Sequence, residues 1–115
     1  MIKRTSLIVL WLLLLVGCAK PLPQDKLDYV GEWRSKEMVL LILADGTVSY
    51  ERLKNGGKVS INGPLQEFNG NDFAVGFGLL TTTFVVSEPP YQENGHWYMV
   101  VDGVRLRKQD EWESL

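Results

Sequence analysis

Residues 38–53 read MVLLILADGTVSYERL, and their pattern predicts the fold class more directly than any other segment of the chain. Asp45-Gly46 favours the positive φ angles that a tight turn between antiparallel strands requires. After the turn, Val48 and Tyr50 alternate with polar residues, which is the two-residue period of a strand with one buried face. The apolar run before the turn is short and lacks a helical polar stripe. The segment therefore predicts a β-hairpin.

Outside this hairpin, similar turn signals recur along the chain. They are separated mostly by about 6–12 residues, a spacing typical of strands rather than helices. Over residues 104–107, apolar side chains alternate with arginines in the same way. We therefore predict an all-β domain, an antiparallel meander of about seven or eight short strands that closes into a barrel or sandwich. The turn signals are Asn55-Gly56-Gly57, Asn62-Gly63-Pro64, Asn69-Gly70, Asn94-Gly95 and Asp102-Gly103.

The N-terminus has the order of a secretory signal. Lys3 and Arg4 precede ten consecutive apolar residues, 7–16. Ten residues in a helix span about 15 Å, roughly half of the hydrocarbon core of a bilayer. A cleaved signal peptide therefore fits this run better than a membrane-spanning helix does.

The stretch LVGC, residues 15–18, resembles the lipobox of bacterial lipoproteins, and Cys18 is the chain's only cysteine. The resemblance implies that diacylglycerol alkylates the thiol of Cys18 and that a peptidase cuts between Gly17 and Cys18. Further acylation, for example with palmitate, would give a durable membrane anchor, since two or three acyl chains bind far more firmly than one. In Gram-negative lipoproteins, an aspartate just after the lipidated cysteine favours retention at the inner membrane. This sequence has Ala19 and Lys20 at those positions. The resemblance thus implies the periplasmic face of the outer membrane, if the source is Gram-negative.

These features divide the chain of 115 residues into three parts. We expect a lipoprotein signal peptide at 1–17, the lipidated cysteine and a flexible tether at 18–28, and one all-β domain at 29–115. Pro21 and Pro23 oppose helix formation in the tether, which would reach at most about 35 Å. Removal of the signal peptide takes two positive charges from a net charge of −2 and leaves −4. A nucleic-acid partner is therefore not expected.

Gly31-Glu32-Trp33 opens the predicted domain and resembles the G-x-W with which lipocalins and related calycin barrels begin. In those families the tryptophan closes one end of the barrel, and an arginine from the last strand lies across it. The resemblance implies that Trp33 is buried at a barrel end and capped by Arg105 or Arg107, as a cation over an indole ring. The alternative is that Trp33 is an ordinary core residue.

The residues needed for common active sites are sparse. His96 is the only histidine, and no serine or threonine stands out beside it as a nucleophile. One histidine and one lipidated cysteine do not suffice for a typical zinc site. Residues 69–72 lack the downstream acid of an EF-hand loop, and the glycines of residues 76–78 do not open a dinucleotide-binding helix. We therefore expect no catalytic site, no metal and no cofactor.

Residues 87–97 are predicted to form a long loop and are the candidate contact site. Pro89 and Pro90 stiffen it into an extended form, and Tyr91 and Trp97 are aromatic residues of the kind enriched in binding sites. The expected partner is an envelope protein or a glycan. The alternative is a solvated loop with Tyr91 folded back on the domain.

Three functions remain open at this point. A binding module predicts a filled interior and an exposed aromatic patch. A lipocalin-like carrier of a small apolar ligand predicts an apolar lumen of roughly 300 Å3 or more. An envelope enzyme, the least favoured of the three, predicts a cleft around His96 with acidic residues nearby.

Overall fold

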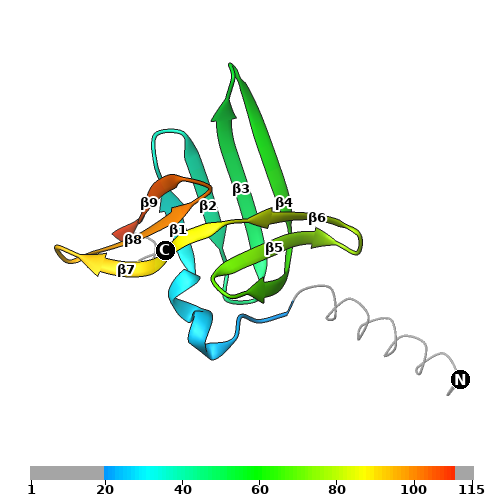
Figure 1. The fold of residues 1–115 in the computed structure, drawn as a ribbon, viewed down its shortest axis with the longest axis horizontal. Coiled ribbons are helices and arrows are strands. Elements are labelled where there is room, and N and C mark those ends of the chain that lie inside the picture. The colour runs from blue at the N-terminus through cyan, green and yellow to red at the C-terminus, as the bar shows by residue number, and fades with distance from the viewer. Residues whose placement is uncertain (1–19, 111–115) are drawn as a thin grey trace, which may run out of the picture.

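The computed structural model describes residues 20–110. Within them it shows an all-β fold, in which nine antiparallel strands form one sheet that curls into a half-barrel (Figure 1). Cys18 and the proposed cleavage site at Gly17 lie outside the described residues. A 3-10 helix, η1 (Gln24–Tyr29), precedes the strands, which are β1 (Gly31–Arg34), β2 (Met38–Ile42), β3 (Thr47–Lys54), β4 (Gly57–Asn69), β5 (Asp72–Phe77), β6 (Leu80–Phe84), β7 (Val86–Glu93), β8 (His96–Val101) and β9 (Val104–Lys108).

The strand order is β6-β5-β4-β3-β2-β1-β9-β8-β7, so that the sheet consists of two meanders, β1–β6 and β7–β9. The predicted all-β class and the antiparallel meander are confirmed. The hairpin predicted over residues 38–53 is also confirmed, with Leu40 opposite Tyr50 and Ile42 opposite Val48. The strand number is nine rather than seven or eight, because residues 86–93, which were expected to be largely loop, form β7.

One corner of the half-barrel lies inside β4, where the strand changes its partner. Residues up to Pro64 pair with β3, and residues from Leu65 onward pair with β5, with a bulge between Leu65 and Glu67. The turn predicted at Asn62-Gly63-Pro64 is therefore wrong. Pro64 has no N–H to donate to a second ladder, and the next amide, that of Leu65, donates to the carbonyl of Gly46 at 2.7 Å.

The other corner lies between β6 and β7, which are the two edge strands of the sheet and are separated only by Val85. Two aspartates hold this corner. The amide of Val85 donates to Oδ1 of Asp102 at 2.9 Å, and the amide of Asp102 donates back to the Val85 carbonyl at 2.8 Å. The amide of Val86 donates to Oδ1 of Asp72 at 2.8 Å. The ends of the sheet are thus joined by a continuous stretch of chain.

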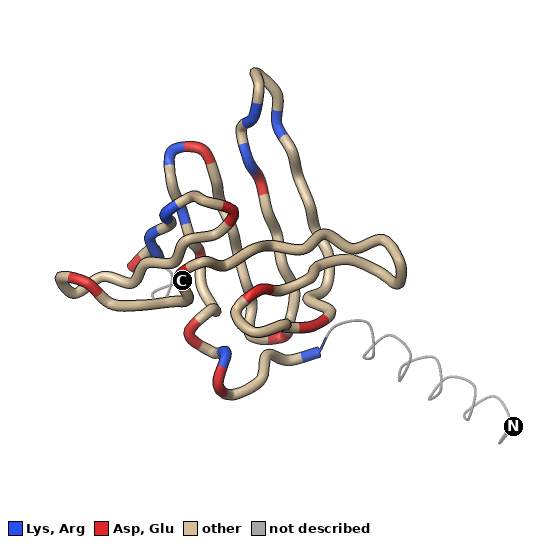
Figure 2. The backbone as a smooth tube through the Cα atoms, in the orientation of Figure 1, with Lys and Arg blue, Asp and Glu red and all other residues tan. Residues whose placement is uncertain are grey.

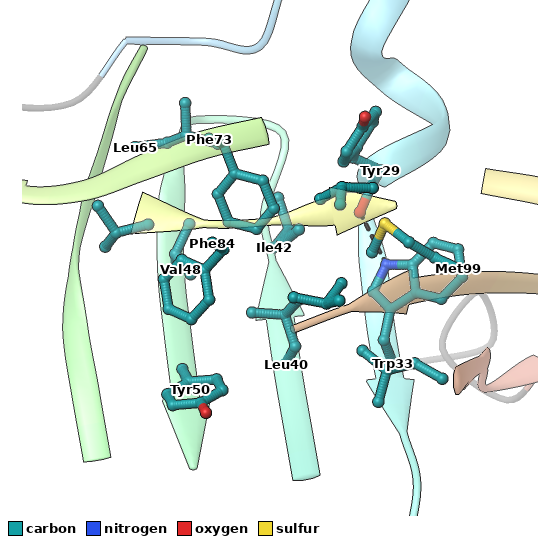
Figure 3. Packing of buried hydrophobic residues seen from close by; sticks show 14 of the residues in the cluster. Tyr29, Trp33, Leu40, Ile42, Val48, Tyr50, Leu65, Phe73, Phe84 and Met99 are labelled. Atoms are coloured by element: carbon teal, nitrogen blue, oxygen red, sulfur yellow. Dashed lines mark hydrogen bonds between the residues drawn. The ribbon is translucent and has the colours of Figure 1, made fainter. Parts of the chain in front are cut away.

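Apolar side chains fill the concave side of the sheet (Figure 3). Phe73 and Phe84 stack with 5.1 Å between their ring centroids, and Tyr50 meets Phe84 edge-on at 4.9 Å. Among residues 20–110, no polar or charged residue is buried in this core. The side chains with almost no exposure include Trp33, Met38, Leu40, Ile42, Phe73, Phe84, Met99 and Leu106.

Helix η1 packs against one end of the curled sheet through Tyr29. The Tyr29 hydroxyl donates to the Asn71 carbonyl at 2.9 Å, and Nε1 of Trp33 donates to the Tyr29 carbonyl at 2.8 Å, the bond dashed in Figure 3. Burial of the phenol, together with the negative charge of Asp72, raises the pKa of Tyr29 to about 12. Sequence-distant segments are therefore tied together at this end.

The segment before η1 differs from the flexible tether that the sequence predicted for residues 18–28. Leu22 is buried, and its amide donates to the Ala44 carbonyl at 3.1 Å. Pro21 and Pro23 do oppose an α-helix, but a 3-10 helix begins directly after Pro23, a position at which a missing N–H costs little. The folded domain therefore begins before residue 29.

Candidate binding surface

The outer face of β7, β8 and β9 carries four side chains that contact one another: Tyr91, Glu93, Tyr98 and Arg105, here called the Tyr–Arg cluster. Tyr91 lies directly opposite Tyr98 across β7 and β8, and their ring centroids are 5.8 Å apart. The guanidinium carbon of Arg105 lies 3.7 Å from the Tyr98 ring centroid. Its Nε donates to the Tyr91 hydroxyl at 3.1 Å, and its Nη2 lies 3.3 Å from a carboxylate oxygen of Glu93.

The neighbours of Arg105 in the Tyr–Arg cluster favour its charged form. The hydrogen bond with Tyr91 is the largest cause that raises the pKa of Arg105, and the charge interactions with Tyr91 and then Glu93 raise it further. About half of the side-chain surface of both Arg105 and Glu93 is exposed, so water screens their attraction and the pair contributes little to stability. The cluster is therefore an ordered polar and aromatic surface that remains accessible from outside.

The strand alternation explains why Arg105 lies on this face. Val104 and Leu106 point into the core, and Arg105 and Arg107 point outward. Nη2 of Arg107 lies 3.0 Å from Nδ1 of His96. It also lies 3.5 Å from a carboxylate oxygen of Asp110, which is 3.6 Å from the same His96 nitrogen. Within the described residues, His96 thus contacts the side chains of Arg107 and Asp110, which form an ion pair at the surface.

The predicted contact loop at residues 87–97 is instead a hairpin of β7 and β8. Pro89, Pro90 and Tyr91 lie on β7, whose pairing with β8 is irregular between Glu88 and Tyr91, because the two prolines cannot donate to the ladder. Trp97 lies on β8, where it is half-buried and packs against the core. The structure therefore brings Tyr91 into the Tyr–Arg cluster and leaves Trp97 out of it.

Two members of the cluster, Tyr98 and Arg105, were not predicted as contact residues. Both are separated from Tyr91 in the sequence, and the contact arises from the pairing of three strands. The sequence does contain one signal for Tyr98. Neighbouring residues of a strand point to opposite faces, so Trp97 and Tyr98 have their rings on opposite faces of β8.

The prediction that Arg105 or Arg107 caps Trp33 is wrong. Trp33 is fully buried, but the cation near its ring is Lys108, whose Nζ lies 4.9 Å from the ring centroid. Trp33 pairs directly with Lys108 across β1 and β9, and directly paired residues project from the same face of a sheet. Arg105 and Arg107 alternate to the outer face.

Several hollows lie along the part of the chain that the structure describes. One of about 240 Å3 lies between residues 20–23 and β4. A second, of about 210 Å3, lies between the β1–β2 turn and the β3–β4 hairpin, and one of about 510 Å3 opens to solvent beside the turn of that hairpin. Within residues 20–110, no group of three or more His, Cys, Asp or Glu side chains gathers to hold a metal ion.

Comparisons of the chain with protein-family models, with curated proteins and with solved structures found no match. In the described part of the chain, no helix is both long and apolar enough to cross a membrane.

Proposed function

We propose that this chain is a bacterial envelope lipoprotein, anchored in the membrane through lipidated Cys18. Its β-domain would bind an envelope protein or a glycan through the Tyr–Arg cluster. The anchor rests on the cationic start, the apolar run and the lipobox-like LVGC of residues 15–18. The observation that supports a binding role is a cluster of the half-exposed Arg105 with the half-buried Tyr91 and Tyr98 on the outer face of a domain whose interior is filled.

The chemistry of the Tyr–Arg cluster suits recognition. Tyrosine and arginine are enriched among the residues that dominate binding energy. Arg105 is already positioned by Tyr91, Tyr98 and Glu93, so little side-chain entropy remains to be lost when a partner binds. The cluster offers guanidinium N–H donors, phenol hydroxyls and a carboxylate acceptor within one small area, a combination that fits the polar groups of a peptide or a sugar.

The filled interior weighs against the alternative of a lipocalin-like carrier. A carrier needs an enclosed apolar lumen, whereas the concave side of this sheet is occupied by large side chains such as Trp33, Phe73, Phe84 and Met99. An enzyme has weaker support still, because His96 contacts Arg107 and Asp110 rather than a nucleophile.

Two measurements on cells test the proposal. Intact mass spectrometry of the membrane-extracted protein should show a diacylglycerol-modified Cys18 at the new N-terminus, and Cys18→Ser should leave a longer precursor without palmitate label. A photoreactive residue in place of Glu88, which lies beside the cluster on β7, should cross-link to one defined protein or glycan product. The same group in place of the exposed Ser60 on β4 should not.

A matched pair of arginine variants completes the test. Arg105→Ala should abolish the Glu88 cross-link, whereas Arg34→Ala, which removes an arginine of equal exposure and similar ion pairing, should leave it unchanged. An unlipidated Cys18 would refute the anchor. The binding surface would be refuted if Arg105→Ala left the yield of the Glu88 cross-link unchanged. It would also be refuted if the cross-link from Ser60 formed in equal yield.

A further inference from the structure

The hairpin of β5 and β6 exposes three large apolar side chains at its tip. Phe77 is 59% exposed, Leu80 is 84% exposed and Leu79 is fully exposed, at 102%. Together with Gly78 they form the segment FGLL, residues 77–80, here called the FGLL tip. Farther down the same hairpin, Phe73 points into the core. The tip therefore projects apolar surface beyond the folded core, which water disfavours.

Beyond Asp72 at its base, the β5–β6 hairpin also carries no charged side chain. No Lys, Arg, Asp or Glu occurs from residue 73 to residue 87, and Figure 2 shows the β5–β6 hairpin without blue or red except at its base. The hairpin of β3 and β4, by contrast, carries lysines on both sides of its turn, Lys54 and Lys58. Edge strands are usually protected by charges, especially lysine, and β6 lacks this protection. Such a hairpin suits an apolar environment.

The beginning of the described chain lies near the base of this hairpin. Lys20 and Gln66 line the same hollow, and Nε2 of Gln66 donates to the carbonyl of Gly76, the residue before the FGLL tip. Leu22 is fixed by its hydrogen bond to Ala44. Figure 1 shows the start of the described part of the chain, in blue, and the β5–β6 turn on the same side of the molecule. In the sequence, Cys18 stands two residues before Lys20, and two residues span at most about 7 Å.

We propose that the FGLL tip inserts into the same lipid bilayer that holds the acyl chains on Cys18. This inference rests on the lipid anchor of the proposed function. Apolar side chains at a membrane surface settle about 5–10 Å into the boundary between headgroups and acyl chains. Only the tip enters, because an open strand edge such as that of β6 is not tolerated in hydrocarbon. The domain is then attached at two points, which fixes its orientation on the membrane.

This orientation leaves the Tyr–Arg cluster accessible. The strands β7–β9 lie on the opposite side of the domain from the β5–β6 turn (Figure 1). A domain held by the FGLL tip and the anchor therefore presents the outer face of β7–β9 away from its own membrane. Two linked contacts also retain a protein more firmly than either contact alone.

Fluorescent labels at two leucines test the insertion. Lipidation blocks Cys18, the only natural cysteine, so that Leu79→Cys and Leu53→Cys each provide a single reactive thiol. Leu53 is the matched control, because it is also an exposed leucine, at 60%, but lies on the β3–β4 hairpin. Each lipidated protein is labelled with an environment-sensitive dye and reconstituted into vesicles of phosphatidylethanolamine and phosphatidylglycerol. Bromine-labelled acyl chains report contact with lipid, and iodide reports contact with water.

We expect the Leu79 label to shift its emission to the blue, to be quenched by the brominated lipid and to be protected from iodide. The Leu53 label should remain quenched by iodide only. The proposal is overturned if the vesicle-bound protein keeps its Leu79 label accessible to iodide and unaffected by the brominated lipid. It is also overturned if that label self-quenches without lipid contact, since a second copy of the chain would then cover the tip.

Mass spectrometry of the same protein sample distinguishes a failure of the lipid anchor at Cys18 from a failure of the insertion of the FGLL tip. If Cys18 carries no diacylglycerol, the proposed anchor fails, and the tip is then examined in the Cys18→Ser, Leu79→Cys chain mixed with the same vesicles. Quenching by brominated lipid in that chain supports insertion by the hairpin itself, and its absence overturns the insertion. Because Leu79 is fully exposed, its replacement does not disturb the core.

Discussion

The ammonium nitrogen of Lys108 lies 4.9 Å from the centroid of the Trp33 ring, where β1 and β9, the first and last strands along the chain, pair inside the sheet. The same nitrogen lies 5.1 Å from the Trp97 ring and donates to the Asp28 carbonyl at 3.0 Å. The lysine thus connects β9, β8, β1 and the end of η1. The cation covers a tryptophan that is itself hydrogen-bonded to the carbonyl of Tyr29.

The contact between Lys108 and Trp33 should be measurable as a coupling energy. Lys108→Met keeps the apolar stem and removes the charge, so it should lower the free energy of unfolding by about 0.5–1 kcal/mol. Trp33→Ala should lower it by about 3–5 kcal/mol, as for other large-to-small core changes. In the Trp33→Ala background the cost of Lys108→Met should shrink. Arg107→Met should cost the same in both backgrounds, and urea titration measures all of these free-energy changes. Equal costs for Lys108→Met in both backgrounds would contradict the contact.

The corner at Val85 should depend on the side-chain oxygen of Asp102. Asp102 has a positive φ of 48°, which asparagine tolerates and alanine disfavours. Asp102→Ala loses the bond to the Val85 amide and adds backbone strain, so it should lower the free energy of unfolding by about 1–2 kcal/mol. Asp102→Asn keeps an acceptor oxygen and should change it by less than about 0.5 kcal/mol. Guanidinium titration compares the two, and equal effects would show that the side chain does not hold the corner.

Tyr29 should make the fold sensitive to alkaline pH. Its pKa is raised from 10.0 to about 12 in the folded state, so the unfolded chain loses this proton first as the pH rises. The resulting stabilisation is complete below pH 10 and is lost as the pH passes through 12. Because the hydroxyl is only part-buried, the loss should be about 1–2 kcal/mol.

Tyr29→Phe is the control for this titration. It removes the ionising group and should flatten the decline between pH 10 and pH 12, measured by urea titration at each pH. It also removes the bond to Asn71, so it should cost about 1 kcal/mol at neutral pH. A decline of the same size in the phenylalanine variant would assign the effect to other groups.

The packing of the chain start should depend on Gly46. A Cβ atom at this position would overlap the carbonyl oxygen of Lys20, and the φ of Gly46 is +94°. Gly46→Ala should therefore cost more than the roughly 1 kcal/mol of backbone strain expected for Gly56→Ala, where φ is +78° but the space is open. It should also make residues 20–23 more accessible to proteases, as limited digestion followed by mass spectrometry would show. Identical behaviour of the two variants would mean that the segment does not pack there.

Local patterns predicted the fold class because tight turns and strand alternation are local properties. Asp45-Gly46, Asn94-Gly95 and Asp102-Gly103 all lie between paired strands as expected. The inward positions of Val104 and Leu106 were also predicted correctly. Each of these features depends on a few neighbouring residues and on the two-residue period of a strand.

The errors arose where a distant partner decides the local structure. Gly63-Pro64 has the composition of a turn, yet it lies where β4 exchanges β3 for β5, a change that only the whole sheet defines. Pro89-Pro90 was expected to stiffen a long loop, but both residues lie in β7, an edge strand, where prolines are tolerated. The Tyr–Arg cluster was only partly predicted, since three strands must pair before Arg105 reaches Tyr91 and Tyr98.

The short ladder between β1 and β9 has a consequence for how the domain opens. Two residue pairs, Trp33 with Lys108 and Arg34 with Arg107, form the ladder between the β7–β9 meander and the rest of the sheet. At its other end the meander is linked through Val85 and through the bond from the Val86 amide to Asp72. Loss of that ladder would release three strands together while β2, β3 and β4 keep their longer ladders. Amide hydrogens of β8 and β9 should therefore exchange with solvent as one cooperative unit, at a lower free energy than those of β3. The Tyr–Arg cluster lies wholly on this unit, so a partner that binds it would slow exchange most in the part of the domain that opens first.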